Sequence, residues 1–376
     1  MEMHGPQVVR GKHLYALVGR SWPRGHASEG EGAGANPRPP VTVALAGDTM
    51  LGRAVAAALA STPPAALFSP EVVSAARQAD LFVLNLECCI SRRGTPWPDP
   101  DKAFFFRAPP VAVDVLTELG VSCVSLANNH ALDFGADALL DTLEHLEAAG
   151  VETVGAGPDL ERARAPVVLE ASGFRLAVVG VTDHPAAYAA GPTRPGVAHV
   201  DLRRGVPSWL LELVSGLDAD AVLVTPHWGP NMATGPLPST RAAAARLLAA
   251  GATVIAGHSA HVFQGVEGPV LYDLGDFVDD YATNGLVRND LGLLFLVTLD
   301  VAGPVRLEAV PLKLEYCHTR LARGAEASWI RRRFRRACLS FGTRVTEEAG
   351  RLVVEWRTTG PGARRRRTLP AGGDRP

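Results

Sequence analysis

The sequence contains few cysteines, and their spacing matches no metal-binding or redox motif. The number is odd, and no C-x-x-C pair occurs among them. The five positions are Cys88, Cys89, Cys123, Cys317 and Cys338. Free cysteines in apolar or strand-like surroundings behave as small hydrophobic residues. The cysteines therefore indicate neither a thiolate metal site nor a redox site, and they favour a reducing compartment.

The chain also lacks an excess of charge and a long apolar run. Its formal net charge is -2 over 376 residues, which provides no electrostatic reason to expect nucleic acid as a partner. No run reaches the ~18 apolar residues of a membrane span. Residues 1–19 carry charges where a signal peptide needs about 7 to 15 apolar residues. We expect no membrane span and, by default, a cytoplasmic location, with envelope association left open.

Both ends of the sequence are poor in the apolar residues that a folded core needs. Residues 20–40 are rich in glycine, proline and charge, and the far end carries the basic run ARRRR. Such segments cannot bury enough apolar surface to offset the entropy of ordering. We predict a disordered leader over residues 1–40 and a disordered basic tail over 359–376. Between them we predict a main domain over 41–315 and a small helix-strand appendage over 316–358.

Short apolar runs alternate with helical patterns in the main domain. The runs VTVALAG, ADLFVLNLE, VSCVSLANN, AVLVTPHWG and ATVIAGH are typical of strands buried on both faces. Two hairpins, at residues 165–182 and 290–312, interrupt the alternation. This indicates an α/β fold with a mixed sheet or with two sheets packed face to face. Helices are predicted at residues 53–60, 71–78, 111–119, 136–149, 206–215 and 239–250.

A compact set of polar residues follows each central strand. Loops at the C-terminal ends of strands are the usual place for ligand sites in α/β folds. A set of nitrogen and oxygen donors without thiolate suits divalent ions of the Mn, Fe or Zn class. Six donors exceed one tetrahedral site and fit two ions about 3.5–4 Å apart, with a carboxylate that bridges them and a water between them that becomes hydroxide. One or two ions are therefore expected. The candidate metal ligands are Asp48, Glu87, Asn129, His227, His258 and His261.

Each of these residues has a structural alternative when it is considered singly. Asp48 follows a strand and could be a helix N-cap, and Asp133 could cap the helix at 136–149. His227, beside Trp228, could be a structural histidine. The ligand hypothesis is favoured because all these groups recur at the same edge of one inferred sheet.

Seven motifs occur in one order between about residues 43 and 281: GDTMLGR, NLECCIS, FFRAPP, ANNHALDFG, TPHWG, GHSAHVFQGVE and LYDLGDFVDDY. In this series the chain resembles the capsule synthesis protein CapA family, which is linked to poly-γ-glutamate. That family is similar to calcineurin-like metallophosphatases. The resemblance implies a four-layer α/β/β/α sandwich of metallophosphatase type, with mixed sheets.

The resemblance also implies roles for residues in the first half of the series. Asp48 matches the aspartate of an Asp-x-His motif, whereas Met50 stands where that motif has a histidine ligand. Glu87 stands in for a bridging aspartate. Asn129 and His130 match an Asn-His motif, which implies a ligand amide and a transition-state donor or acid. Together with His130 we assign Asp133 to the catalytic residues.

The second half of the series also departs from the family. His227 matches an isolated histidine ligand, and the final Gly-His-x-His motif is lengthened so that His258 and His261 are three residues apart. Asp276 replaces the asparagine of the family's LGNF, and Asp279 and Asp280 follow it. Guanidinium groups pair with carboxylate or phosphate. We predict that substrate contacts come from Arg53, Arg107, Asn128 and Asp276.

Two functional hypotheses follow. The first is a metal-dependent hydrolase of a phosphoester or a γ-glutamyl bond, associated with poly-γ-glutamate or capsule biosynthesis, whose substrate is an anionic small molecule or polymer. The alternative is a non-catalytic, polyanion-binding accessory protein of poly-γ-glutamate synthesis or export. The segment WIRRRFRRACLSF has an apolar stripe and a basic face, which suits docking on the domain and, less directly, binding of a polyanion.

Overall fold

Alternate residues of strand β1 (Val41–Thr49) face two different apolar cores. The side chains of Val41, Val43 and Leu45 lie in one core, and those of Ala44 and Ala46 lie in another. Successive side chains of a strand point to opposite faces of the sheet. A strand that is apolar on both faces therefore needs a layer on each side of it. The computed structural model, which describes residues 39–357, supplies both layers.

The larger sheet is mixed. Its strand order is β19-β20-β17-β16-β1-β2-β5-β6, with β15 paired to β1 and β18 paired to β17. β1 runs parallel to β2 and β15 and antiparallel to β16. Its strands besides β1 are β2 (Leu81–Leu86), β5 (Cys123–Ser125), β6 (Glu152–Val154), β15 (Asp276–Val278), β16 (Leu291–Asp300), β17 (Gly303–Glu315), β18 (His318–Leu321), β19 (Thr346–Glu348) and β20 (Arg351–Glu355).

The smaller sheet has the order β13-β14-β12-β11-β9-β8 and packs face to face on the larger one. Its strands are β8 (Val167–Ala171), β9 (Phe174–Thr182), β11 (Ala221–His227), β12 (Val254–Ala256), β13 (Val266–Glu267) and β14 (Val270–Leu271). Two pairs of very short strands lie outside both sheets: β3 (Cys89–Ile90) with β4 (Arg107–Ala108), and β7 (Ala156–Gly157) with β10 (Gly196–Val197).

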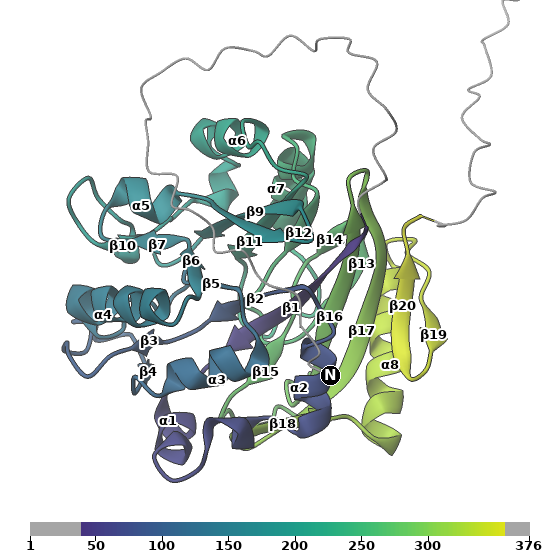
Figure 1. Cartoon of the computed structure of the whole chain (residues 1–376), viewed down its shortest axis with the longest axis horizontal. Helices are drawn as coiled ribbons and strands as arrows, with labels where there is room; N and C mark the ends of the chain where they lie inside the picture. Colours follow the sequence, from purple (N-terminus) through teal and green to yellow (C-terminus); the bar gives the residue numbers. More distant parts are fainter. Residues whose placement is uncertain (1–38, 358–376) are drawn as a thin grey trace, which may run out of the picture.

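Helices cover the outer faces of the two sheets (Figure 1). The larger sheet packs against α1 (Arg53–Leu59), α2 (Pro70–Ala76), α3 (Ala112–Leu119) and α4 (Gly135–Ala148). The smaller sheet packs against α6 (Ser208–Ser215) and α7 (Pro238–Ala249). The predicted four-layer α/β/β/α fold is therefore confirmed. The remaining helical segments are α5 (Leu160–Arg164), α8 (Gly324–Leu339) and the 3-10 turns η1 (Pro64–Leu67), η2 (Ala186–Tyr188) and η3 (Leu202–Arg204).

The last two strands, β19 and β20, complete the larger sheet, and the last helix lies beside them. β20 pairs antiparallel with β17, and α8 lies beside it (Figure 1). Ile330, Phe334 and Cys338 of α8 belong to the core between the sheets. The predicted leader lies outside the described residues apart from 39–40, and the predicted tail at 359–376 lies wholly outside them. The boundary predicted near residue 315 stays a prediction.

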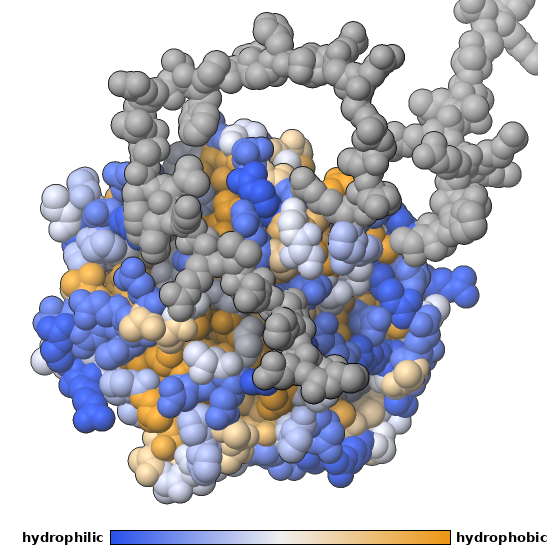
Figure 2. Space-filling model, in the orientation of Figure 1, coloured by the Kyte–Doolittle hydropathy of each residue, from blue (hydrophilic) through white to orange (hydrophobic). Residues whose placement is uncertain are grey.

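The visible surface is mostly hydrophilic. Figure 2 shows hydrophilic side chains over most of this face, with apolar side chains at the lower left, where α1, α3 and α4 lie in Figure 1. Within residues 39–357, no helix has both the length and the apolar character to cross a membrane.

The packing of α8 leads to a stability prediction. Phe334 is fully buried and lies edge-on to Phe263, with ring centroids 6.2 Å apart. We expect Phe334→Ala to lower the free energy of unfolding by about 3–5 kcal/mol, because truncating a buried phenyl ring leaves a cavity. Leu339, on the same helix, is 70% exposed, and Leu339→Ala should change stability by less than about 0.5 kcal/mol. Denaturant unfolding followed by far-UV circular dichroism measures both. An unchanged main transition in Phe334→Ala would show that α8 folds separately.

Candidate metal centre

The candidate centre lies where strands of both sheets end. Asp48 is near the end of β1, His227 ends β11, and His258 follows β12. Glu87 comes directly after β2, and Asp276 begins β15. Parallel strands place their carboxyl ends at one edge of a sheet. The two facing sheets thus bring groups from distant parts of the sequence to one place.

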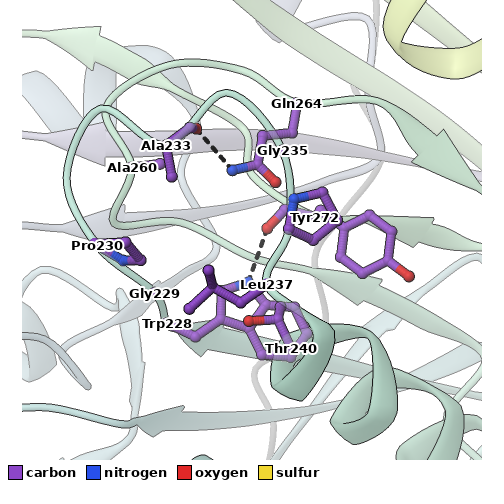
Figure 3. Close-up of a pocket in the computed structure, with 11 residues that line it drawn as sticks. Trp228, Gly229, Pro230, Ala233, Gly235, Leu237, Thr240, Ala260, Gln264 and Tyr272 are labelled. Atoms are coloured by element: carbon purple, nitrogen blue, oxygen red, sulfur yellow. Dashed lines mark hydrogen bonds between the residues drawn. The ribbon is translucent and has the colours of Figure 1, made fainter. Parts of the chain in front are cut away.

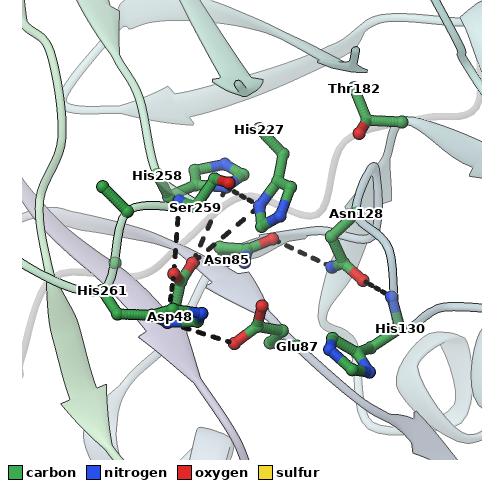
Figure 4. Close-up of polar contacts among 12 residues, drawn as sticks. Asp48, Asn85, Glu87, Asn128, His130, Thr182, His227, His258, Ser259 and His261 are labelled. Carbon is green, nitrogen blue, oxygen red and sulfur yellow. Dashed lines mark hydrogen bonds and ion pairs between the residues drawn. The ribbon is translucent and has the colours of Figure 1, made fainter. Parts of the chain in front are cut away.

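The carboxylate of Asp48 is the hub of this cluster (Figure 4). It is completely buried, and its Oδ1 accepts a hydrogen bond from Asn85 Nδ2 at 2.7 Å. Its Oδ2 accepts from the backbone N–H of Ser259 at 3.2 Å and lies 3.2 Å from His261 Nδ1. Asp48 therefore does not cap a helix. The N-cap of α1 is Gly52, which makes no side-chain cap bond.

Two further imidazoles face the other oxygen of Asp48. His258 Nδ1 lies 3.8 Å and His227 Nδ1 lies 4.0 Å from Asp48 Oδ1. The two Nδ1 atoms are 2.7 Å apart. A tetrahedral ion bound at about 2.0–2.2 Å holds its ligands roughly 3.3–3.6 Å apart. The distances among the three donor atoms lie on both sides of that spacing, so the side chains need only small shifts to share an ion.

His261 lies on a separate side of Asp48. Its Nδ1 is 2.8 Å from Asp276 Oδ1 and 4.0 Å from Glu87 Oε2. Glu87 Oε2 also accepts a hydrogen bond from the hydroxyl of Tyr281 at 3.3 Å. The structure therefore holds two groups of three mutually close donors that share Asp48. They are Asp48, His227, His258 and Asp48, His261, Asp276.

The loop GHSAH has a backbone conformation suited to this arrangement. Ser259 and His261 have positive φ angles of 117° and 58°, which non-glycine residues adopt rarely and which cluster at functional sites. A Cβ at Gly257 would lie 2.3 Å from Trp228 Nε1 and 2.3 Å from the carbonyl oxygen of Tyr272, so only glycine fits there. The loop thereby aims His258 and His261 at opposite sides of Asp48.

Figure 3 shows the small cavity beside this loop, lined by Trp228, Tyr272 and Gln264 among others. Its volume is about 10 Å³, which is at the lower limit for one water molecule and too small for a substrate. Trp228 Nε1 donates to the carbonyl oxygen of Tyr272 at 2.8 Å across it. The cavity is therefore a packing gap beside the GHSAH loop.

Asn128 belongs to a chain of amides that supports Asp48. Its Nδ2 donates to Asn85 Oδ1 at 3.0 Å and to the carbonyl oxygen of Leu86 at 2.8 Å. Its Oδ1 accepts from the backbone N–H of His130 at 3.0 Å. The Asn128 amide is therefore hydrogen-bonded within the protein through both its nitrogen and its oxygen (Figure 4). Asn129, the predicted ligand, has a buried Oδ1 without a hydrogen-bond partner.

His130 and Asp133 form a buried pair. His130 Nδ1 lies 2.6 Å from Asp133 Oδ2, and the ring of Phe106 stacks on the imidazole with centroids 3.9 Å apart. Asp133 also binds Lys102 Nζ at 2.9 Å and accepts from the hydroxyl of Tyr188 at 3.2 Å. Asp133 therefore does not cap α4, whose N-cap is Phe134. It fixes the orientation of His130 instead.

The two predicted substrate arginines differ in their partners. Arg53 pairs with Asp280, with NH2 3.0 Å from Oδ1, and its guanidinium lies 5.4 Å from the ring centroid of Phe104. Arg107 donates to the carbonyl oxygen of Arg93 at 3.2 Å and stacks on Phe134. Both guanidinium groups use part of their hydrogen-bond donor capacity within the protein.

Met50 lies away from the donors. It is completely buried in the apolar core under α1, and its sulfur accepts a hydrogen bond from Gly52 N at 3.1 Å. His184 contacts Asp183, and its ring centroid is 5.1 Å from that of His227.

Burial and neighbouring charges set the protonation of the cluster. Burial lowers the pKa of His258 to about 4, and burial together with His258 lowers the pKa of His227 well below its usual value. Burial also lowers the pKa of His261, but the charges of Asp276 and Glu87 outweigh it and leave that pKa well above normal. His227 and His258 are thus neutral near pH 7, which is the form that binds metals.

The pKa values of the buried carboxylates also shift in opposite directions. Burial raises the pKa of Asp48, but hydrogen bonds and charge from His261 outweigh it, so the pKa is lowered overall. Burial, reinforced by the charge of Asp48, raises the pKa of Glu87 well above normal. Glu87 Oε1 and Asp276 Oδ2 are buried without a hydrogen-bond partner. Neutral imidazoles, a carboxylate and unpartnered carboxylate oxygens together fit a divalent cation.

Several residues of the site were not predicted. Asn85 binds Asp48, and Tyr281 binds Glu87. Asp273 accepts from the backbone N–H of Ala260 at 2.8 Å and so holds the GHSAH loop. Lys102 compensates the negative charge of Asp133. Asn85 lies in the NLECCIS motif, and Asp273 and Tyr281 lie in the LYDLGDFVDDY motif, so these three had a signal in the sequence. Lys102 had none, because it acts through a contact that no local pattern encodes.

Comparison with known proteins agrees with the motif series. The model of the family described as bacterial capsule synthesis protein PGA_cap matches residues 42–281. A probable polyglutamine synthesis accessory protein of Mycobacterium tuberculosis is 33% identical over 294 residues, which cover 73% of this chain and 76% of that protein. The PGA biosynthesis protein CapA of Bacillus subtilis is 29% identical over 282 residues, covering 73% and 72%.

The likeness to solved structures is weaker. A 5'-nucleotidase from Candida albicans SC5314 is 9% identical, with a TM-score of 0.42 over 80% of this chain and 58% of that chain. A TM-score this low supports no conclusion about activity.

The raised pKa of His261 leads to a prediction about proton release. His261 is protonated near pH 7 in the metal-free protein, so an ion that uses its Nδ1 must displace a proton. Affinity for Mn²⁺ should therefore rise with pH up to that raised pKa, whereas His227 and His258 contribute no release. Burial raises the pKa of Glu87 and of Asp276 as well, so these carboxyls add their own protons to the release. Calorimetry in two buffers of different ionisation enthalpy should show proton release at pH 7, and His261→Asn should lower that release by about one proton. An equal release in the variant would contradict this assignment.

Proposed function

The chain belongs to the bacterial capsule synthesis protein family PGA_cap, and from that premise we propose that it is a metal-dependent hydrolase of an anionic phosphoester or γ-glutamyl substrate. The observation that carries the proposal is the buried carboxylate of Asp48 with three imidazoles within 4.0 Å. Asp48, His227 and His258 would hold a divalent ion. When bound, that ion would supply a Lewis acid that polarises the scissile group and increases the acidity of water.

The residues of the chain supply the proton transfer. Asp133 accepts at His130 Nδ1, which leaves Nε2 as the nitrogen that exchanges a proton with the substrate. Phe106 stacks on the ring, and Lys102 balances the charge of Asp133, so the imidazole is held in one orientation. His130 is the catalytic acid in this proposal in its protonated form, with a proton on Nε2; burial lowers the pKa of His130, and the hydrogen bond and charge of Asp133 oppose that effect. Asp133 is a positioning residue.

Substrate recognition would come from the rim. The guanidinium of Arg53 lies 5.4 Å from the ring centroid of Phe104, which is 59% exposed, and that of Arg107 lies 4.1 Å from the ring centroid of Phe134. Such groups suit a phosphate or carboxylate attached to an apolar body. Poly-γ-glutamate enters as a candidate polymer because the Bacillus subtilis relative is named for the biosynthesis of PGA. A cytoplasmic location stays a prediction from the sequence.

The hydrolase proposal is tested with purified protein reconstituted with Mn²⁺, Fe²⁺ or Zn²⁺. The substrates are p-nitrophenyl phosphate, bis-p-nitrophenyl phosphate and poly-γ-glutamate. His227→Ala should abolish turnover together with bound metal. His130→Asn should lower kcat by about 10²–10⁴-fold with metal content unchanged, since general acid catalysis contributes that much.

His318→Asn is the matched control, because His318 lies on β18 and bonds to the carbonyl oxygen of Ala66. Its activity should equal that of the wild type. No turnover of any of the three substrates by metal-loaded protein would reject the hydrolase.

A second candidate is a non-catalytic accessory protein that binds a polyanion. Arg332 and Arg336 lie one turn apart on α8, both are exposed, and neither has an ion pair among residues 39–357. A relative named as an accessory protein points the same way. Arg332→Gln with Arg336→Gln should then weaken binding to poly-γ-glutamate in EDTA, and the wild-type affinity should fall with added salt. Binding that requires metal, or that the double variant retains, counts against this candidate.

A further inference from the structure

A groove runs along the outward face of α2. It has a volume of about 940 Å³ and is bounded by α2, η1 and β18, which lie side by side (Figure 1). Pro70, Val73, Ser74, Arg77 and Gln78 line it and recur at the three- and four-residue spacing of one helix face. The other lining residues are Ala65, Ala66, Phe68, Ser69 and His318. A volume of this size accommodates several residues of a peptide.

The two basic side chains of the lining are already hydrogen-bonded within the domain. Arg77 Nε and Nη2 both donate to the carbonyl oxygen of Glu118, at 2.8 Å and 2.6 Å. His318 Nδ1 donates to the carbonyl oxygen of Ala66 at 2.8 Å. The two alanines and the proline of the lining are exposed. The surface left to be covered is therefore largely apolar, and it suits an apolar peptide better than an anion.

The chain enters the fold at one end of this groove. Thr42 N donates to Asp80 Oδ2, and Asp80 N donates to the carbonyl oxygen of Thr42, both at 2.8 Å. Asp80 comes two residues after Gln78, which lines the groove at the end of α2. Residues 1–38, which precede the described part of the chain, are therefore attached beside the groove.

The sequence of residues 1–38 contains an apolar run of matching length, LYALV at 14–18. From Pro70 to Gln78 the helix rise gives a groove length of about 12 Å, and five extended residues span about 16 Å. Residues 19–38 separate the run from the described part, and a flexible tether of that length has an end-to-end distance of roughly 25 Å. The run can therefore reach the whole groove.

Covalent attachment also favours this segment over a separate partner. A short flexible tether holds its two ends at an effective concentration of about millimolar. A contact with an intrinsic dissociation constant below that value is then mostly formed within one molecule. A small apolar surface of alanine, proline and valine side chains is therefore sufficient for an attached segment.

We propose that residues 14–18 dock in the groove along α2 of the same molecule. This interaction surface lies outside the metal centre, and the inference does not depend on the proposed hydrolase activity. The apolar run covers the small side chains of α2 and η1, and residues 19–38 connect it to the start of β1.

The first test measures amide hydrogen exchange of the full-length protein by mass spectrometry. Ser74 is exposed on α2, and Ser74→Arg places a bulky cation in the groove that also repels Lys12 and Arg20 on either side of the run. Amides of residues 14–18 should exchange at least about tenfold more slowly in the wild type than in Ser74→Arg. Equal exchange in the two proteins would overturn the proposal.

Ser215→Arg is the matched control, because Ser215 is an exposed serine of α6, on the smaller sheet. It adds the same charge and bulk to a helix surface away from the groove. The exchange of residues 14–18 in this variant should equal that of the wild type. Loss of protection in the control as well would show that added charge, not the groove, is responsible, and would reject the assignment.

The second test empties the groove in the full chain. Leu14→Ser with Leu17→Ser removes the apolar side chains of the run. A fluorescein-labelled peptide of residues 10–20 should then bind this double variant at least about tenfold more tightly than it binds the wild type, because the attached run no longer competes. Adding Ser74→Arg should remove that binding. Equal affinity for the double variant and the wild type, measured by fluorescence anisotropy, counts against the groove.

Two other occupants give different results. Protection of residues 14–18 that rises with protein concentration, together with a dimer in analytical ultracentrifugation, would place the run in the groove of a second copy and overturn docking within one molecule. Absence of both protection and peptide binding would leave the groove to a separate partner and would also reject the proposal.

Discussion

The carboxylate of Asp48 is completely buried, and its charge has to be compensated by groups far away in the sequence. One oxygen accepts from the Asn85 amide, and the other accepts from the backbone N–H of Ser259 and faces His261. The pair of imidazoles of His227 and His258 faces the first oxygen. Removing one of these partners leaves the buried charge less compensated, and the two histidines of this pair are available only because the smaller sheet meets the larger one here.

The α/β/β/α layering is what makes that compensation available. Asp48 comes from the larger sheet and His227 from the smaller one, and the core between them holds the strand ends in register. The positive φ angles of Ser259 and His261 then turn two imidazoles three residues apart toward different oxygens of one carboxylate. Backbone strain of this kind persists only where the surrounding contacts hold it, as Asp273 does through Ala260.

The strands and helices were predictable where burial imposes a clear periodicity of apolar residues on the sequence. β1 and β2 are apolar on both faces and were found from that property, as was each helix that covers a sheet. The helix α5 was not found, because five residues are too short to show helical periodicity. The basic helix α8 was found, but its place in the core between the sheets depends on Phe263 and Phe295, which lie far from it in the chain.

The sequence by itself determined which polar groups end the central strands, because a buried strand followed by a polar residue is a local pattern. It thereby identified Asp48, His227, His258 and His261 as a set. Only the tertiary structure decided how they divide between the two oxygens of Asp48, and that Asp276 joins one side while Asn128 supports Asp48 through Asn85. The physical reason is that distance between side chains depends on strand pairing, and β15 pairs with β1 across more than 220 residues of sequence.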